Sequence, residues 1–101
     1  MDGAKQRAAL RGLAFSLDAL ELTKRVMAGR CEVSGLTFDL SRDARETYVR
    51  PFAPSLDRRV PELGYTMENV QVVAWVYNAA KGQGTHEDVL ALARALLAAS
   101  A

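Results

Sequence analysis

The sequence predicts a small α+β domain, organised around a strand–turn–strand–helix unit at about residues 54–81. The first strand is predicted over residues 55–60 and ends at Pro61. The second is predicted over residues 69–73, whose valines are typical of a buried sheet. From Ala74 the apolar residues recur with a helical period, up to a glycine-rich turn. Helical patterns also precede and follow this unit, so we expect flanking helices at both ends.

The helical N-terminal part spans residues 4–28 and contains two predicted helices. The first covers residues 4–13, and the second covers residues 19–28. Asp18 and Glu21 have the spacing of a capping box, in which each side chain accepts a hydrogen bond from a free backbone N–H of the first turn. The second helix is therefore predicted to begin directly after Asp18.

A last helix is predicted at about residues 86–98. Thr85 stands at its N-cap, and Asp88 three residues later supports the first turn. We expect its apolar stripe to be buried; the stripe comprises Val89, Leu92, Ala93 and Leu96. His86 is an isolated histidine in the first turn, and such a residue is more often a surface residue than a catalytic base.

Size and composition indicate one ordinary domain. The 101 residues are enough for a single small core, and the formal net charge is only +1. The chain therefore has no overall basic charge for nucleic acid, although a local basic patch stays open. No apolar run is long enough to cross a bilayer, and the N-terminus lacks the pattern of a signal peptide. We expect a cytoplasmic protein without a membrane partner.

The segment between the helical part and the central unit carries the single cysteine, Cys31. Residues 31–38 alternate around a Ser34–Gly35 turn and are predicted to form a short hairpin. A zinc knuckle requires a second cysteine where Ser34 stands, so we expect a buried thiol and no zinc site. Residues 39–50 are polar, with arginines interspersed among acids, and are predicted to form a loop with a helical turn.

Four polar residues of the central unit stand where packing does not require them: Asp57, Arg58, Asn69 and Asn78. Each has an ordinary explanation. Asp57 and Arg58 can form a surface ion pair, and Asn69 can tighten a turn. Asn78 can be a polar position on a helix surface. Taken together, however, carboxylate and amide oxygens in this order also suit a divalent metal ion beside a phosphodiester.

Three linked segments resemble the HNH endonucleases: Leu-Asp-Arg-Arg-Val, Glu-Asn-Val-Gln-Val-Val and Trp-Val-Tyr-Asn. The core of that family is a two-stranded hairpin and a helix around one divalent ion, the ββα-metal fold. Upstream, Cys-Glu-Val-Ser-Gly-Leu-Thr-Phe and Pro-Phe-Ala-Pro-Ser-Leu-Asp-Arg are similar to phage and prophage members. The resemblance covers residues 31–81, about half of the chain. It implies one HNH-like domain over residues 1–101, with the ββα core at about residues 54–81.

The resemblance implies a role for each of the four polar residues. Asp57 and Asn78 would ligate Mg²⁺ or Mn²⁺, and Asn69 would brace the loop between the strands beside the scissile phosphate. Arg58 replaces the histidine that acts as general base in the family. Because arginine stays protonated, Arg58 cannot take a proton from water, but it can bind phosphate through two hydrogen bonds.

The resemblance also implies DNA as the partner. The basic residues that we expect to contact it are Arg58, Arg59, Arg50, Lys81, Arg7 and Arg11. The predicted function is DNA binding by an HNH-like domain, with metal-dependent cleavage or nicking of phosphodiester bonds if the site is intact. The alternative is a catalytically inactive domain that acts as a DNA-binding regulator or as a protein-interaction module. A homodimer or a protein partner also stays open.

Overall fold

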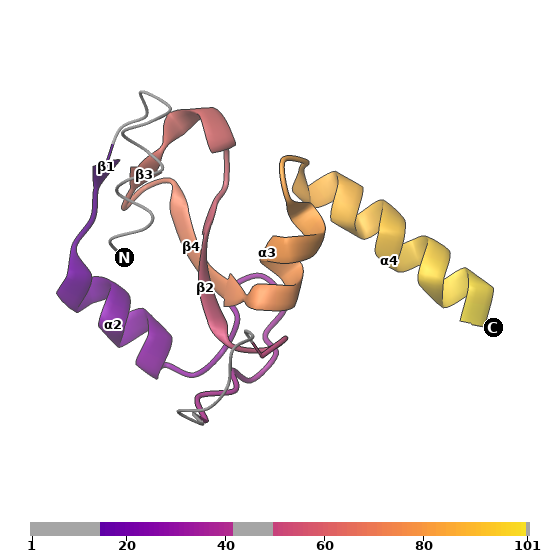
Figure 1. Ribbon diagram of the computed structural model, residues 1–101, viewed down its shortest axis with the longest axis horizontal. Coiled ribbons are helices and arrows are strands. Elements are labelled where there is room, and N and C mark those ends of the chain that lie inside the picture. Colours follow the sequence, from indigo (N-terminus) through magenta and orange to yellow (C-terminus); the bar gives the residue numbers. More distant parts are fainter. Residues whose placement is uncertain (1–14, 42–49, 101) are drawn as a thin grey trace.

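The computed structural model describes residues 15–41 and 50–100. Within them lie an antiparallel pair of strands, a short parallel pair and three helices (Figure 1). The elements in chain order are β1 (Phe15–Ser16), α2 (Ala19–Met27), β2 (Pro54–Arg58), a 3-10 turn (Pro61–Leu63), β3 (Tyr65–Thr66), β4 (Val70–Ala74), α3 (Trp75–Lys81) and α4 (His86–Ser100). The predicted α+β class is confirmed. The predicted helix at residues 4–13 lies outside the described residues.

The centre of the molecule is the antiparallel pair of β2 and β4, in which Leu56 lies opposite Val72 and Asp57 opposite Gln71. All five residues of β4 are buried. This burial explains why β4 is almost continuously apolar and does not alternate with polar residues. The predicted strands and the helix after them are thus present, with their boundaries shifted by one or two residues.

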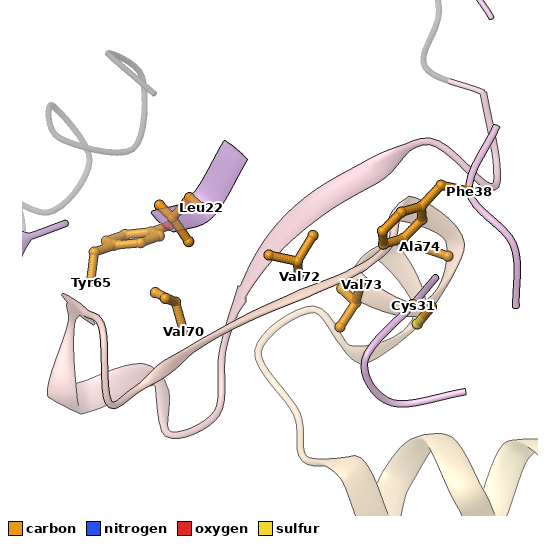
Figure 2. Close-up of a cluster of buried hydrophobic side chains, with 8 residues drawn as sticks. All are labelled: Leu22, Cys31, Phe38, Tyr65, Val70, Val72, Val73 and Ala74. Atoms are coloured by element: carbon orange, nitrogen blue, oxygen red, sulfur yellow. The ribbon is translucent and has the colours of Figure 1, made fainter. Parts of the chain in front are cut away.

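The core forms around β4 and draws on segments far apart in the sequence (Figure 2). Leu22 of α2 and Tyr65 lie at one end of the cluster, and Cys31 and Phe38 lie at the other. Its buried members are Leu22, Cys31, Phe38, Tyr65, Val70, Val72, Val73 and Ala74. Cys31 is free and buried, as predicted. A core this small leaves many large apolar side chains at the surface.

The predicted hairpin at residues 31–38 is present only in minimal form, around a turn at residues 32–34. Its strand pairing is reduced to an isolated bridge between Arg30 and Thr37. Across the turn, the N–H of Cys31 donates to the carbonyl of Leu36 at 2.8 Å. Cys31 of this segment is buried in the core.

Glu32 connects this turn to two other elements. Its N–H donates to the carbonyl oxygen of Val72 at 2.9 Å, and its Oε1 accepts from the N–H of Val72 at 2.7 Å. The guanidinium of Arg25, on α2, donates to both carboxylate oxygens and to the carbonyl of Val70. The hydrogen bonds from Arg25, followed by the one from Val72, hold the pKa of Glu32 below its ordinary value of 4.5, although burial opposes them.

The N-terminal ends of α2 and α3 are fixed in different ways. At α2, the N–H of Glu21 donates to Oδ1 of Asp18 at 3.1 Å, so the predicted cap is confirmed. At α3, the N–H groups of Trp75 and Val76 donate to carbonyl oxygens of residues 51–53, each at 2.8 Å. Two of the free donors of the first turn of α3 are therefore satisfied by the segment that leads into β2.

The predicted burial of the last helix is wrong. No residue of α4 is buried, although Val89 and Leu90 are half-buried. The predicted cap is present, since the N–H of Asp88 donates to Oγ1 of Thr85 at 3.2 Å. After the glycine-containing turn that follows α3, however, α4 extends away from the body of the molecule (Figure 1). No helix in the described part of the chain has the length and apolar character that a membrane crossing requires.

We predict that Glu32 makes stability depend on pH in the acid range. Because its folded-state pKa is lowered, its contribution is complete above its ordinary pKa of 4.5 and is lost as pH falls through the folded-state value. Glu32→Gln should therefore lower the free energy of unfolding at neutral pH. The difference from wild type should shrink at about pH 3, measured by urea unfolding at both pH values.

Glu62→Gln is the matched control, because Glu62 is an exposed carboxylate in the 3-10 turn. It should leave the free energy of unfolding within about 0.5 kcal/mol of wild type at neutral pH. A Glu32→Gln variant whose deficit is as large at about pH 3 as at neutral pH would show that its loss does not come from the charge.

Candidate functional site

A buried ion pair links the middle of the sheet to the end of α3. Asp57 projects from β2 and Lys81 from the last turn of α3, and their side chains are 5% and 2% exposed. The ammonium of Lys81 lies 3.0 Å from Oδ1 and 2.8 Å from Oδ2 of Asp57. The amide of Gln71, directly opposite Asp57 on β4, donates to Oδ2 at 2.7 Å. Both oxygens of this carboxylate are thus engaged.

The ammonium of Lys81 is held by backbone groups as well. It donates to the carbonyl oxygen of Arg58 at 2.6 Å and lies 3.4 Å from that of Arg59. A buried charge is tolerated only where it is paired and hydrogen-bonded, and Lys81 meets both conditions. Lys81, a predicted DNA contact, is therefore enclosed, and it fixes the backbone at the end of β2.

Asn69 braces the loop that connects β2 to β4. Its Oδ1 accepts from the N–H of Val60 at 3.0 Å, and its Nδ2 donates to the carbonyls of Val60 and Gly64 at 2.9 and 2.6 Å. Its own carbonyl accepts from the N–H of Arg59 at 2.8 Å. The buried side chain of Asn69 thereby joins the two ends of the loop. The backbone carbonyl of Asn69 fixes the position of Arg59 at the end of β2.

Asn78 ties α3 to the first half of β2. Its Nδ2 donates to Oγ of Ser55 and to the carbonyl of Leu56, both at 2.9 Å. The carbonyl can only accept, so the amide nitrogen of Asn78, and not its oxygen, faces the strand. Asn78 and Lys81 are one helical turn apart and therefore share the face of α3 that packs on β2.

The arrangement around Asp57 does not fit a divalent cation. Magnesium and calcium sites need carboxylate oxygens at about 2.0–2.6 Å from the ion. Here an ammonium group lies within 3.0 Å of both oxygens of Asp57, on the side of the carboxylate that faces α3. The predicted second ligand, Asn78, presents its nitrogen to β2. A metal ion would have to displace Lys81 and turn the amide of Asn78.

The two arginines after Asp57 have different surroundings. Arg58 is half-buried; its guanidinium donates to the carbonyl of Pro61 at 2.9 Å and lies 5.0 Å from the centre of the Tyr65 ring, as in a cation–π contact. Arg59 is exposed, and its side chain forms no hydrogen bond or ion pair with any described residue. Arg59 is therefore the arginine of this pair whose guanidinium is available to a ligand.

Arg59 lines a polar hollow of about 400 Å³ beside the ion pair. The hollow is bounded by Glu32, Val33, Arg59, Gln71, Tyr77, Lys81 and His86. On its wall, the hydroxyl of Tyr77 and Nδ1 of His86 are 2.9 Å apart and share a hydrogen bond between α3 and α4. Burial, together with the charge of Asp57, raises the pKa of Tyr77, so this hydroxyl keeps its proton.

The other predicted DNA contacts do not join this hollow. Arg50 precedes β2 at the opposite end of the strand, where its guanidinium lies 3.5 Å from Oδ2 of Asp39. Arg7 and Arg11 lie outside the described residues. Of the basic residues predicted to contact DNA, Arg59 and Lys81 line the hollow.

Sequence reasoning missed three polar residues of the hollow, Gln71, Tyr77 and Glu32, as well as the apolar Val33. Gln71 carried a signal, because one amide within a run of buried valines requires a buried hydrogen-bond partner. Glu32 and Tyr77 carried none, since their positions depend on how the turn and α3 pack. His86 was considered at the sequence level as a surface residue, and it is exposed here, at the rim of the hollow.

Comparison of the chain with protein-family models, with curated proteins and with solved structures finds no match.

We predict that Lys81→Met destabilises the fold strongly, because it leaves the carboxylate of Asp57 buried without its cation. The expected loss is about 3–5 kcal/mol in the free energy of unfolding, measured by urea denaturation. The double variant Asp57→Asn/Lys81→Met removes both charges and should recover part of that loss.

Lys24→Met is the matched control, because Lys24 is an exposed lysine on α2. It should change the free energy of unfolding by no more than about 0.5 kcal/mol. If Lys81→Met costs as little as Lys24→Met, the ion pair does not hold β2 to α3 in solution.

Proposed function

We propose that this chain binds DNA through the phosphate backbone at the hollow beside β2 and α3, and that it does not cleave it. The carrying observation is that Arg59 lines the polar hollow while its guanidinium has no hydrogen bond or ion pair with a described residue. The backbone of Arg59 is fixed by Lys81 and Asn69. The strand–strand–helix order and the resemblance to the HNH endonucleases support DNA as the partner.

The charges around the hollow favour a group with one negative charge. Its charged lining residues are Glu32, Arg59 and Lys81. Glu32 is opposed by Arg25, and Lys81 is opposed by Asp57. Arg59 also attracts Glu32, but the charges of Glu32, Arg25, Asp57, Lys81 and Arg59 together leave one positive charge, and a phosphodiester carries one negative charge to match it. Arginine also presents parallel N–H donors that fit two phosphate oxygens.

The absence of cleavage follows from two local features. Arg58 takes the place of the family's general base, and an arginine cannot accept the proton of an attacking water. Asp57, which the resemblance makes a metal ligand, serves instead as the counter-ion of Lys81. We therefore propose the inactive, DNA-binding alternative, in which the core of an HNH-like unit is kept as a scaffold.

We predict that Arg59→Ala weakens binding to duplex DNA about tenfold at low salt, because a charge-assisted contact to phosphate is lost. The slope of log affinity against log salt should fall by about one unit. Fluorescence anisotropy with a labelled duplex, between about 50 mM and about 200 mM salt, measures both quantities.

Lys24→Ala removes the same charge from an exposed position on α2 that does not line the hollow, and should change affinity and salt slope less than Arg59→Ala does. If both variants weaken binding equally, the contact is non-specific attraction to the whole chain. If wild type does not bind even at about 50 mM salt, the chain does not bind DNA, and a protein-interaction module is favoured.

We predict that wild type leaves supercoiled plasmid intact with either Mg²⁺ or Mn²⁺, at concentrations at which it binds the plasmid. Nicking that appears with a metal and disappears in Asp57→Asn/Lys81→Met would contradict this proposal and support a metal-dependent nuclease. The double variant suits this test because it removes the charge of Asp57 without leaving Lys81 unpaired.

A further inference from the structure

The wall of the polar hollow carries a histidine that the phosphate contact of Arg59 does not use. His86 is the single histidine of the chain. It is the first residue of α4, is exposed, and lines the hollow together with Arg59. Histidine is the side chain whose charge ordinarily changes between about pH 5 and about pH 8. The hollow therefore contains a group that is able to gain a positive charge near neutral pH.

Tyr77 determines what a proton on His86 does to the wall of the hollow. Its hydroxyl lies 2.9 Å from Nδ1 of His86, and burial raises the pKa of this hydroxyl, which keeps its proton. A neutral imidazole with its proton on Nε2 accepts this hydrogen bond at Nδ1. In the imidazolium both ring nitrogens donate, so Nδ1 donates to the oxygen of Tyr77 and the hydroxyl proton is free for another acceptor. Protonation thus adds a positive charge and a hydrogen-bond donor to the wall.

The charges that surround His86 come from the hollow and from its own helix. Arg59 and Lys81 oppose a further positive charge, whereas Glu32 favours it. Hydrogen bonds from Arg25 hold the pKa of Glu32 below its ordinary value of 4.5, so Glu32 stays ionised where histidine takes up its proton. The charged groups around His86 are Glu32, Arg59 and Lys81 in the hollow, Asp57 as the partner of Lys81, and Glu87 and Asp88 in the first turn of α4.

We propose that His86 is a second phosphate contact of the hollow, and that its protonation tightens the binding of DNA as pH falls. This inference rests on the proposed function, because it concerns the same hollow and the same ligand. A phosphodiester keeps its one negative charge between about pH 5 and about pH 8, so the change arises on the protein. A further contact to phosphate releases further counterions, which makes binding both tighter and more dependent on salt.

Fluorescence anisotropy with a labelled duplex, at about pH 8 and about pH 5.5, tests this proposal. We expect the affinity of wild type to rise about threefold or more at the lower pH, with a salt slope that is steeper by up to about one unit. His86→Gln should show neither change, because glutamine stays neutral and can still hydrogen-bond to the hydroxyl of Tyr77. His86 is exposed, so this variant should keep the circular dichroism spectrum of wild type.

The double variant His86→Gln/Leu20→His is the matched control, because it moves the histidine to α2. Leu20 is 69% exposed and does not line the hollow. This variant contains as many histidines as wild type, and its affinity should rise less than that of wild type as pH falls. An equal rise in both proteins would show that the charge acts through the chain as a whole, which would overturn the inference.

The remaining results separate this inference from the proposed function. If wild type binds duplex DNA equally well at both pH values, or if His86→Gln keeps the dependence on pH, the inference fails and the proposed function stands. If wild type binds at neither pH, even at about 50 mM salt, the proposed function fails and the inference fails with it.

Discussion

The ion pair between Asp57 and Lys81 is the constraint on which the central unit depends. It joins the middle of β2 to the last turn of α3, and the same ammonium group holds the carbonyl of Arg58. Two charges in the interior are costly unless every one of their hydrogen bonds is made. Sheet and helix therefore have little freedom to move apart, and the contact of Asn78 with β2 follows from this placement. The pair sets geometry more than it adds stability.

This pair also separates the chain from the chemistry that its sequence resembles. In a metal site, a carboxylate in this position binds a metal ion, and that ion can exchange its other ligands. In this chain the cation is the covalently attached ammonium of Lys81, which cannot activate water. What the unit still offers is a rigid frame, with Arg59 at its edge and the hollow beside it. The proposed phosphate contact depends on this frame, because the frame fixes the backbone of Arg59.

The parts of the fold that depend on neighbours in sequence were predictable. The capping residue Asp18 placed the start of α2, and the valines of β4 indicated a buried strand before a helix. The pairing of Asp57 with Lys81 was not predictable, because 24 residues separate them and neither spacing nor composition encodes the packing of α3 on β2. For α4, periodicity showed that an apolar face exists. It could not show that the described part of the chain leaves most of that face exposed.

The position of Glu32 has a consequence for how copies of this chain can meet. A sheet of two strands has two open edges, and an open edge invites a strand of another molecule to add to it. Val72 lies in the middle of β4. Its carbonyl accepts a hydrogen bond from the backbone N–H of Glu32, and its own N–H donates to the carboxylate of Glu32. That edge is closed to strand addition and to the aggregation that begins there. A strand added at this edge would have to displace Glu32 from Val72.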